Sequence, residues 1–106
     1  MRQGVSGAGR TLRRFRGELK VDFRIAPHVA WHRLEDEAVI IDIPERTAIG
    51  LNPSGTYVWG LIEDHDLEGI AARVADHFRI TPERALSDVT ALLEELRSRG
   101  LVEEAE

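Results

Sequence analysis

The segment Asn52-Pro53-Ser54-Gly55 divides this chain into a part with strand patterning and a part with helical patterning. Before it, apolar residues alternate with polar ones or cluster as β-branched residues, which is typical of strands. After it, apolar residues recur at three- and four-residue spacing, as along one face of a helix. An Asn-Pro turn followed by serine is a helix-start pattern, so we predict that helices begin here with Ser54 as the cap.

Strand patterns precede this boundary in the segments 21–25, 29–34, 38–43 and 47–51. The first two are separated by Pro27 and form either one bent strand or two short ones. The segment 38–43 is the strongest strand signal, because it is rich in β-branched residues. The segment 47–51 is weaker and contains the small residues Ala48 and Gly50, which would let another backbone approach if this strand lies at a sheet edge.

Three amphipathic helices are predicted after the boundary. The first ends near residues 63–65, the second is capped by Asp66, and the third is capped by Thr81 with Pro82 in its first turn. Gly100 suits the left-handed position just past a helix, from which Leu101 can fold back on the last turn. The residues predicted to be buried are Tyr57, Val58, Trp59, Leu61 and Ile62, then Leu67, Ile70, Ala71, Val74, Ala75 and Phe78, then Ala85, Leu86, Val89, Leu92, Leu93 and Leu96. Strands followed by helices predict one α+β domain.

Charge is distributed unevenly along the chain. Residues 1–20 carry six Arg or Lys and one Glu, a net charge of +5, whereas residues 21–106 carry eight basic and eighteen acidic residues, a net charge of −10. We therefore predict a flexible basic arm over residues 1–19 and a folded acidic domain over residues 20–106. An acidic surface repels nucleic acid and anionic membranes. No apolar run is long enough for a membrane helix, and we expect a cytoplasmic protein.

The side chains that commonly carry catalysis or bind metals do not form a convincing set. The chain has no cysteine, which excludes thiolate zinc sites, disulfides and cysteine nucleophiles. His28 and His32 have metal-ligand spacing only on a helix, whereas the pattern places them in a strand. Ser54, His65 and Asp64 could be drawn as a triad, but Ser54 lacks the glycine-flanked elbow of a nucleophilic serine. We therefore predict no enzymatic activity, no metal and no cofactor.

A helix-turn-helix that reads DNA is an alternative, because the spacing of the last two helices suits that motif. The exposed residues at the start of the third helix are Glu83, Arg84, Ser87 and Asp88, which have no basic excess. Phosphate contacts could come only from the basic arm. Charge therefore argues against nucleic acid as a partner, and DNA binding stays as an alternative.

Several motifs together resemble the PqqD-like family of peptide-recognition domains, a winged helix-turn-helix fold with a three-stranded antiparallel sheet followed by three helices. The order and spacing of the motifs carry the resemblance, which covers roughly residues 23–103. They are Leu51-Asn52-Pro53-Ser54-Gly55 followed by Trp59, the run 70–78, Thr81-Pro82-Glu83-Arg84 with Asp88, and the run 96–101.

The resemblance implies a non-catalytic adaptor that binds the leader of a ribosomally synthesised precursor peptide by strand addition and presents it to a modifying enzyme. The leader would pair with the backbone of Thr47, Ala48, Ile49, Gly50 and Leu51, and would lie against Ala85, Asp88, Val89 and Leu92 of the third helix. The enzyme partner expected from the resemblance is a lasso-peptide leader peptidase. The alternatives are a PqqD-type chaperone that delivers its precursor to a radical S-adenosylmethionine enzyme, and a winged-helix DNA-binding regulator.

Overall fold

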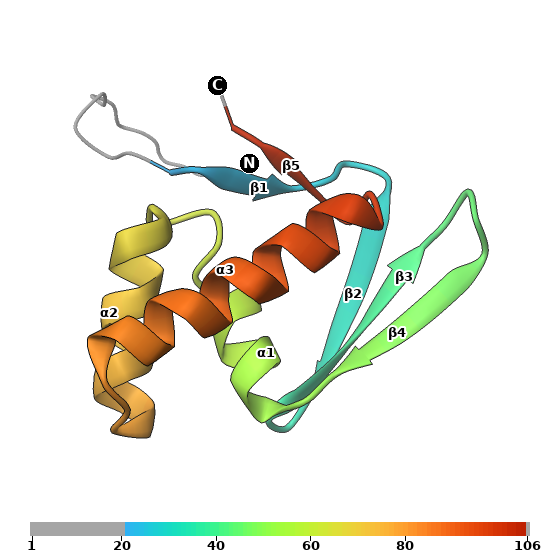
Figure 1. Ribbon diagram of the computed structural model, residues 1–106. Helices are drawn as coiled ribbons and strands as arrows, with labels where there is room; N and C mark the ends of the chain where they lie inside the picture. Colours follow the sequence, from blue (N-terminus) through green and yellow to red (C-terminus); the bar gives the residue numbers. More distant parts are fainter. Residues whose placement is uncertain (1–20, 106) are drawn as a thin grey trace, which may run out of the picture.

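The computed structural model describes residues 21–105, so the basic arm predicted for residues 1–19 lies outside the described residues. A three-stranded sheet lies on one side of the last helix and the second helix lies on the other (Figure 1). The elements are β1 (Phe23–Ile25), β2 (Val29–Leu34), β3 (Glu37–Asp42), β4 (Thr47–Leu51), α1 (Pro53–Trp59), α2 (Leu67–Phe78), α3 (Pro82–Ser98) and β5 (Val102–Glu104). The α+β prediction of a three-stranded antiparallel sheet followed by three helices is confirmed.

The five strands form two antiparallel sheets. The larger sheet has the order β2-β3-β4, with β3 in the centre and β4 paired with β3 alone among the described strands. The smaller sheet pairs β1 with β5, and an ion pair of 3.1 Å joins Arg24 Nε to Glu103 Oε1 across it. Residues 21–34 therefore form two short strands that belong to different sheets, and not one bent strand. The sequence did not predict β5, because three residues are too few to show a period.

Asn52, and not Ser54, caps α1. The Asn52 Oδ1 atom accepts hydrogen bonds from the Gly55 N–H at 2.8 Å and from the Ser54 hydroxyl at 3.1 Å. The reason is Pro53, which lacks an N–H and is suited to the first helical position, so that the residue before it takes the cap. The prediction of Ser54 as the cap is wrong by two residues, although a helix does begin within the predicted segment 52–55.

The predicted ends of α2 and α3 are confirmed. The side chain of Asp66 accepts from the Gly69 N–H at 2.8 Å, and that of Thr81 accepts from the Arg84 N–H at 3.1 Å. At the end of α3, Gly100 has a φ of 76°, and the Leu101 N–H donates to the Leu96 carbonyl at 2.9 Å. This is the bond that reverses the chain in a Schellman motif, and it directs the chain into β5.

The core fills the space between the inner face of the larger sheet and the three helices. Its largest fully buried side chains are Ile40, Ile62, Ile70, Leu93, Leu96 and Val102. Trp59 is 2% exposed, and its ring meets Trp31 of β2 edge to face at 6.1 Å between centroids, which joins α1 to the sheet. Phe78 and Leu86, predicted to be buried, are 37% and 38% exposed. The apolar stripes of α2 and α3 are wider than the surface that their neighbours cover.

We predict that Asn52→Ala lowers the free energy of unfolding by about 1 kcal/mol, because it removes the side-chain cap of α1. In a domain of this size the melting temperature should fall by about 4–8 °C. Ser54→Ala removes only an exposed hydrogen bond and should change stability by less than about 0.5 kcal/mol. Thermal melts of the two variants test this order, and a larger loss for Ser54→Ala would contradict it.

Candidate functional site

The open edge of β4 is the first component of the candidate site. In register with β3, Thr47, Ile49 and Leu51 share the face that carries the buried Ile40, whereas Ala48 and Gly50 lie on the opposite face. No residue of β4 is charged and none is proline, the two features with which proteins usually block an exposed strand edge. Within residues 21–105 no strand pairs with the outer edge of β4, so its backbone groups there are available to another chain.

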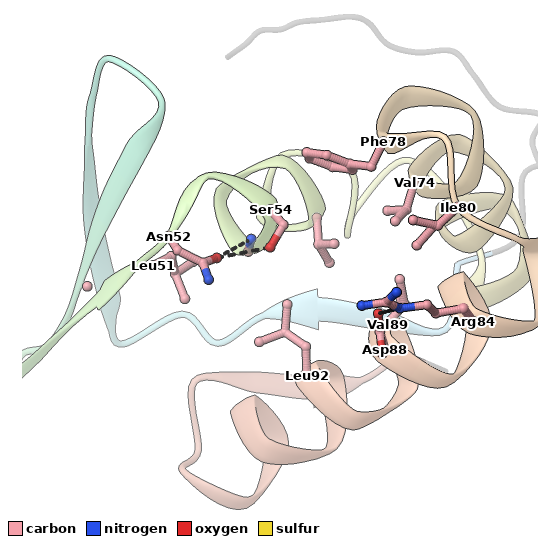
Figure 2. A pocket seen from close by; sticks show the side chains of 13 residues that line it. Leu51, Asn52, Ser54, Val74, Phe78, Ile80, Arg84, Asp88, Val89 and Leu92 are labelled. Atoms are coloured by element: carbon pink, nitrogen blue, oxygen red, sulfur yellow. Dashed lines mark hydrogen bonds and ion pairs between the residues drawn. The ribbon is translucent and has the colours of Figure 1, made fainter.

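A cavity of about 460 Å³ opens at the end of β4 where the chain enters α1. Figure 2 shows Leu51, Asn52 and Ser54 on one side of it and the side chains of α3 along the other. Its lining residues are Gly50, Leu51, Asn52, Ser54, Gly55, Val58, Val74, Phe78, Ile80, Arg84, Asp88, Val89 and Leu92. Most of these side chains are apolar, and the volume lies in the range of sites that take small ligands or large side chains.

Polar and aromatic groups lie at the rim of this cavity. The Nε atom of Arg84 lies 3.5 Å from Oδ2 of Asp88, one turn along α3, and both side chains are more than half exposed. Phe78 at the end of α2 packs edge to face against Tyr57 and His77, which stack on each other with 4.2 Å between ring centroids. These contacts hold the Phe78 ring at the rim (Figure 2), so that an apolar group entering the cavity would meet a fixed aromatic surface.

A small cavity of about 40 Å³ lies at the opposite end of β4. Thr47 and Ile49 line it from β4, Ile40 and Asp42 from β3, and Arg99 and Leu101 from the end of α3. The two cavities thus lie at the two ends of the edge strand, and in both of them β4 residues meet residues of α3 or of its C-terminal turn. We call these two cavities, together with the open edge of β4 between them, the β4–α3 groove.

The structure places most of the predicted site residues along the β4–α3 groove. Gly50, Leu51, Asp88, Val89 and Leu92 line the large cavity, and Thr47 and Ile49 line the small one. Ala48 lines neither of the two cavities, and Ala85 is completely buried in the core.

The sequence did not predict the contributions from the region of α1, from the end of α2 or from Arg84. These residues are Asn52, Ser54, Gly55, Val58, Val74, Phe78, Ile80 and Arg84. These residues lie far apart along the chain, so no local sequence pattern indicated that they meet.

His28, His32 and Ser54 lie in a turn, in a strand and in the first turn of α1. His28 lies in the turn before β2 and not in a strand as predicted, whereas His32 lies in β2. Among residues 21–105 no group of three or more His, Asp or Glu side chains could hold a metal ion. The Ser54 hydroxyl donates to the cap residue Asn52. None of the helices in that part of the chain is both long and apolar enough to span a membrane.

The family model of coenzyme PQQ synthesis protein D (PqqD) matches residues 37–102, which include β3, β4 and all three helices. The chain belongs to the PqqD family. The match covers both walls of the β4–α3 groove and confirms the resemblance found in the sequence. A search of curated proteins finds no match to this member of the family.

Two solved structures share the fold. TbiB1 in complex with the TbiA(beta) leader peptide is 23% identical, with a TM-score of 0.73 over 78% of this chain and 98% of that chain. A lasso peptide synthetase B1 complexed with the leader peptide is 19% identical, with a TM-score of 0.71 over 78% of this chain and 99% of that chain. The matched region spans nearly the whole length of both relatives, so both share the α+β fold of this chain.

Adjacent residues of α3 should differ sharply in their effect on stability. Asp88 is exposed and paired only with Arg84, so Asp88→Ala should change the free energy of unfolding by less than about 0.5 kcal/mol. Val89 is 2% exposed, and Val89→Ala should cost about 2 kcal/mol because it removes buried methyl groups. Urea unfolding measures both values. A loss above about 1 kcal/mol for Asp88→Ala would show that this residue supports the fold.

Proposed function

We propose that this chain binds the leader of a ribosomally synthesised precursor peptide and presents it to a modifying enzyme, without catalysing a reaction itself. The observation that carries the proposal is the unpaired edge of β4, which runs along a groove into an apolar cavity of about 460 Å³. The two solved relatives, each in complex with a leader peptide, support it further.

Strand addition explains how this groove would bind. The leader would extend the larger sheet beside β4, and its main-chain N–H and C=O groups would bond to the open edge whatever its sequence. Alternate side chains of an added strand point to the same face, so every second residue would face α3. Specificity would come from those residues, with a large apolar side chain in the cavity between Leu51, Val89 and Leu92.

The proposed enzyme partner is a leader peptidase of a lasso-peptide pathway. The fold shared with two leader-binding proteins, one of them a lasso peptide synthetase B1, supports this choice. The family name supports the alternative of a radical S-adenosylmethionine enzyme, because PqqD serves coenzyme PQQ synthesis. The genes beside the one encoding this chain separate the two, since a peptidase or a radical enzyme would accompany a short precursor reading frame.

The exposed start of α3 argues against the DNA-binding alternative. A helix-turn-helix protein reads bases mainly from the first turns of its second helix. Here that surface presents Glu83, Arg84, Ser87 and Asp88, and the only cation among them is held by Asp88 at 3.5 Å. An anionic duplex would meet two carboxylates at this position, with no unpaired base-reading cation.

We predict that the protein binds extended peptides and not duplex DNA. A displayed library of random peptides of about 12 residues, long enough to pass both cavities, should yield binders when selected on the full chain. Fluorescence polarisation at physiological salt should then give micromolar affinity for a selected peptide and none for a duplex of random sequence. Micromolar duplex binding that survives deletion of residues 1–17, with no peptide binding, would overturn the proposal.

A pair of tryptophan variants on α3 locates the binding site. Leu92 lines the large cavity, so Leu92→Trp should fill it and reduce peptide affinity at least about tenfold. Leu86 is also on α3 and is exposed, but it does not line this cavity, so Leu86→Trp should leave affinity within about twofold. Thermal melts identify any loss of folding, and equal effects of the two variants on affinity would place the peptide elsewhere.

Proline substitutions in β4 test strand addition directly. Successive N–H groups of an antiparallel strand point alternately to its two sides, so only one of Ala48→Pro and Ile49→Pro removes a donor from the open edge. That variant should stay folded and lose at least about tenfold in peptide affinity, because proline blocks edge pairing. The other removes a bond to β3 and should mainly lower stability.

Ala48→Gly and Ile49→Ala are the matched controls, since each changes the side chain but keeps the N–H. Circular dichroism shows which proline variant is folded. Unchanged peptide affinity in that variant would mean that the peptide does not pair with β4.

A further inference from the structure

Asp42 is a buried carboxylate with few hydrogen-bond partners. It is the last residue of β3 and is only 6% exposed. Its Oδ1 accepts one long hydrogen bond, from the Glu45 N–H at 3.3 Å, and its Oδ2 lies 3.8 Å from Nε2 of His28, which is within ion-pair distance but too long for a hydrogen bond. A carboxylate has about four acceptor positions, and the bond from Glu45 fills one of them. The partners of Asp42 within residues 21–105 therefore leave it with spare acceptor capacity.

The neighbouring cation is already paired with another residue. Arg99 lines the same cavities as Asp42, but its Nη2 and Nε atoms bond to Oε2 of Glu95 at 2.8 and 3.1 Å. No ion pair between Arg99 and Asp42 forms within the described structure, whereas Glu45 adds a second carboxylate beside Asp42. Because Glu95 neutralises Arg99, the surroundings of Asp42 favour an incoming positive charge.

Asp42 lies at the end of the β4–α3 groove opposite the large cavity. It borders the small cavity beside Thr47, and also an open cavity of about 620 Å³ formed by His28, Asp42, Pro44, Glu45, Arg99 and Gly100. The register pairs Asp42 with Thr47, and Thr47 and Leu51 lie on the same face of β4, four residues apart. A strand added beside β4 would thus place side chains four residues apart at the two ends of the groove.

We propose that Asp42 recognises a Lys or Arg side chain of the bound peptide, four residues away along the added strand from the apolar side chain in the large cavity. The inference rests on the proposed function and names the class of peptide that the groove selects. An ammonium or guanidinium group would supply the donors that the Asp42 carboxylate lacks, through a charge-assisted bond in a largely buried position. The small cavity, which Thr47 and Ile49 of β4 line together with Asp42, places this carboxylate beside the edge strand.

Substitutions can separate a purely structural role of Asp42 from a role in peptide recognition. The bond from the Glu45 N–H to Oδ1, together with the bond from the Arg46 N–H to the Asp42 carbonyl at 2.8 Å, forms the turn between β3 and β4. Asp42→Asn keeps the Oδ1 acceptor and the side-chain volume, and removes only the charge. Asp36→Asn is the matched control, because it makes the same charge change in the exposed turn between β2 and β3, away from all three cavities.

The test selects the random peptide library on the full chain as wild type, Asp42→Asn and Asp36→Asn. We expect an apolar anchor in the peptides selected on all three proteins, and Lys or Arg four residues from it only on wild type and Asp36→Asn. A consistent position after the anchor would indicate a peptide antiparallel to β4, and a position before it a parallel one. The inference would be overturned if basic residues were equally enriched on Asp42→Asn, or if they were absent on wild type. The proposed function would still stand in either case, provided that the apolar anchor is selected.

A double-mutant cycle then measures the pair. A selected peptide and its Lys→norleucine analogue are titrated against wild type and Asp42→Asn by fluorescence polarisation. On wild type, the analogue should bind at least about tenfold more weakly than the parent peptide. On Asp42→Asn, the affinities of the two peptides should agree within about twofold. Equal losses on both proteins would overturn the role of Asp42. Failure to select any peptide would overturn the proposed function and the inference together.

Discussion

The attachment of α3 at its two ends is the constraint on which the rest of this molecule depends. Its apolar face packs on α2, and its C-terminal turn at Gly100 and Leu101 directs the chain into β5, which pairs with β1. No extensive packing joins α3 to β4 between these attachments. The helix is therefore held at a fixed position beside a strand edge that it does not cover. The β4–α3 groove follows from this arrangement, and so do the cavities at its ends.

An uncovered edge strand normally favours aggregation, so its persistence needs a physical reason. β4 has only five residues, and a short edge strand is one of the features by which proteins limit edge-to-edge pairing. The apolar walls near Leu51 and Leu92 and the carboxylate of Asp42 lie at opposite ends. Main-chain pairing along β4 would supply affinity for any peptide, whereas these two ends would decide which peptide fits.

The sequence allowed most of the elements to be predicted, with β5 as the exception. The three-four periodicity of α2 and α3, the caps Asp66 and Thr81, and the turn at Gly100 were all correct, because they depend on local backbone chemistry. The cap of α1 was misplaced because two capping residues flank Pro53, and only the fixed proline geometry selects Asn52. The choice of β4 and of one face of α3 as the site came from family resemblance, and the structure places most of those residues along one groove.

By itself, the sequence determined the α+β class, the order of the elements and the acidic character of residues 21–106, because period, capping and charge are local or additive properties. Only the tertiary structure decided which distant residues meet. Phe78 and Ile80 joined the large cavity, Phe23–Ile25 paired with Val102–Glu104, and Asp42 became a buried carboxylate beside the end of α3. The physical reason is that burial and contact depend on packing between elements far apart in the chain, which no local pattern records.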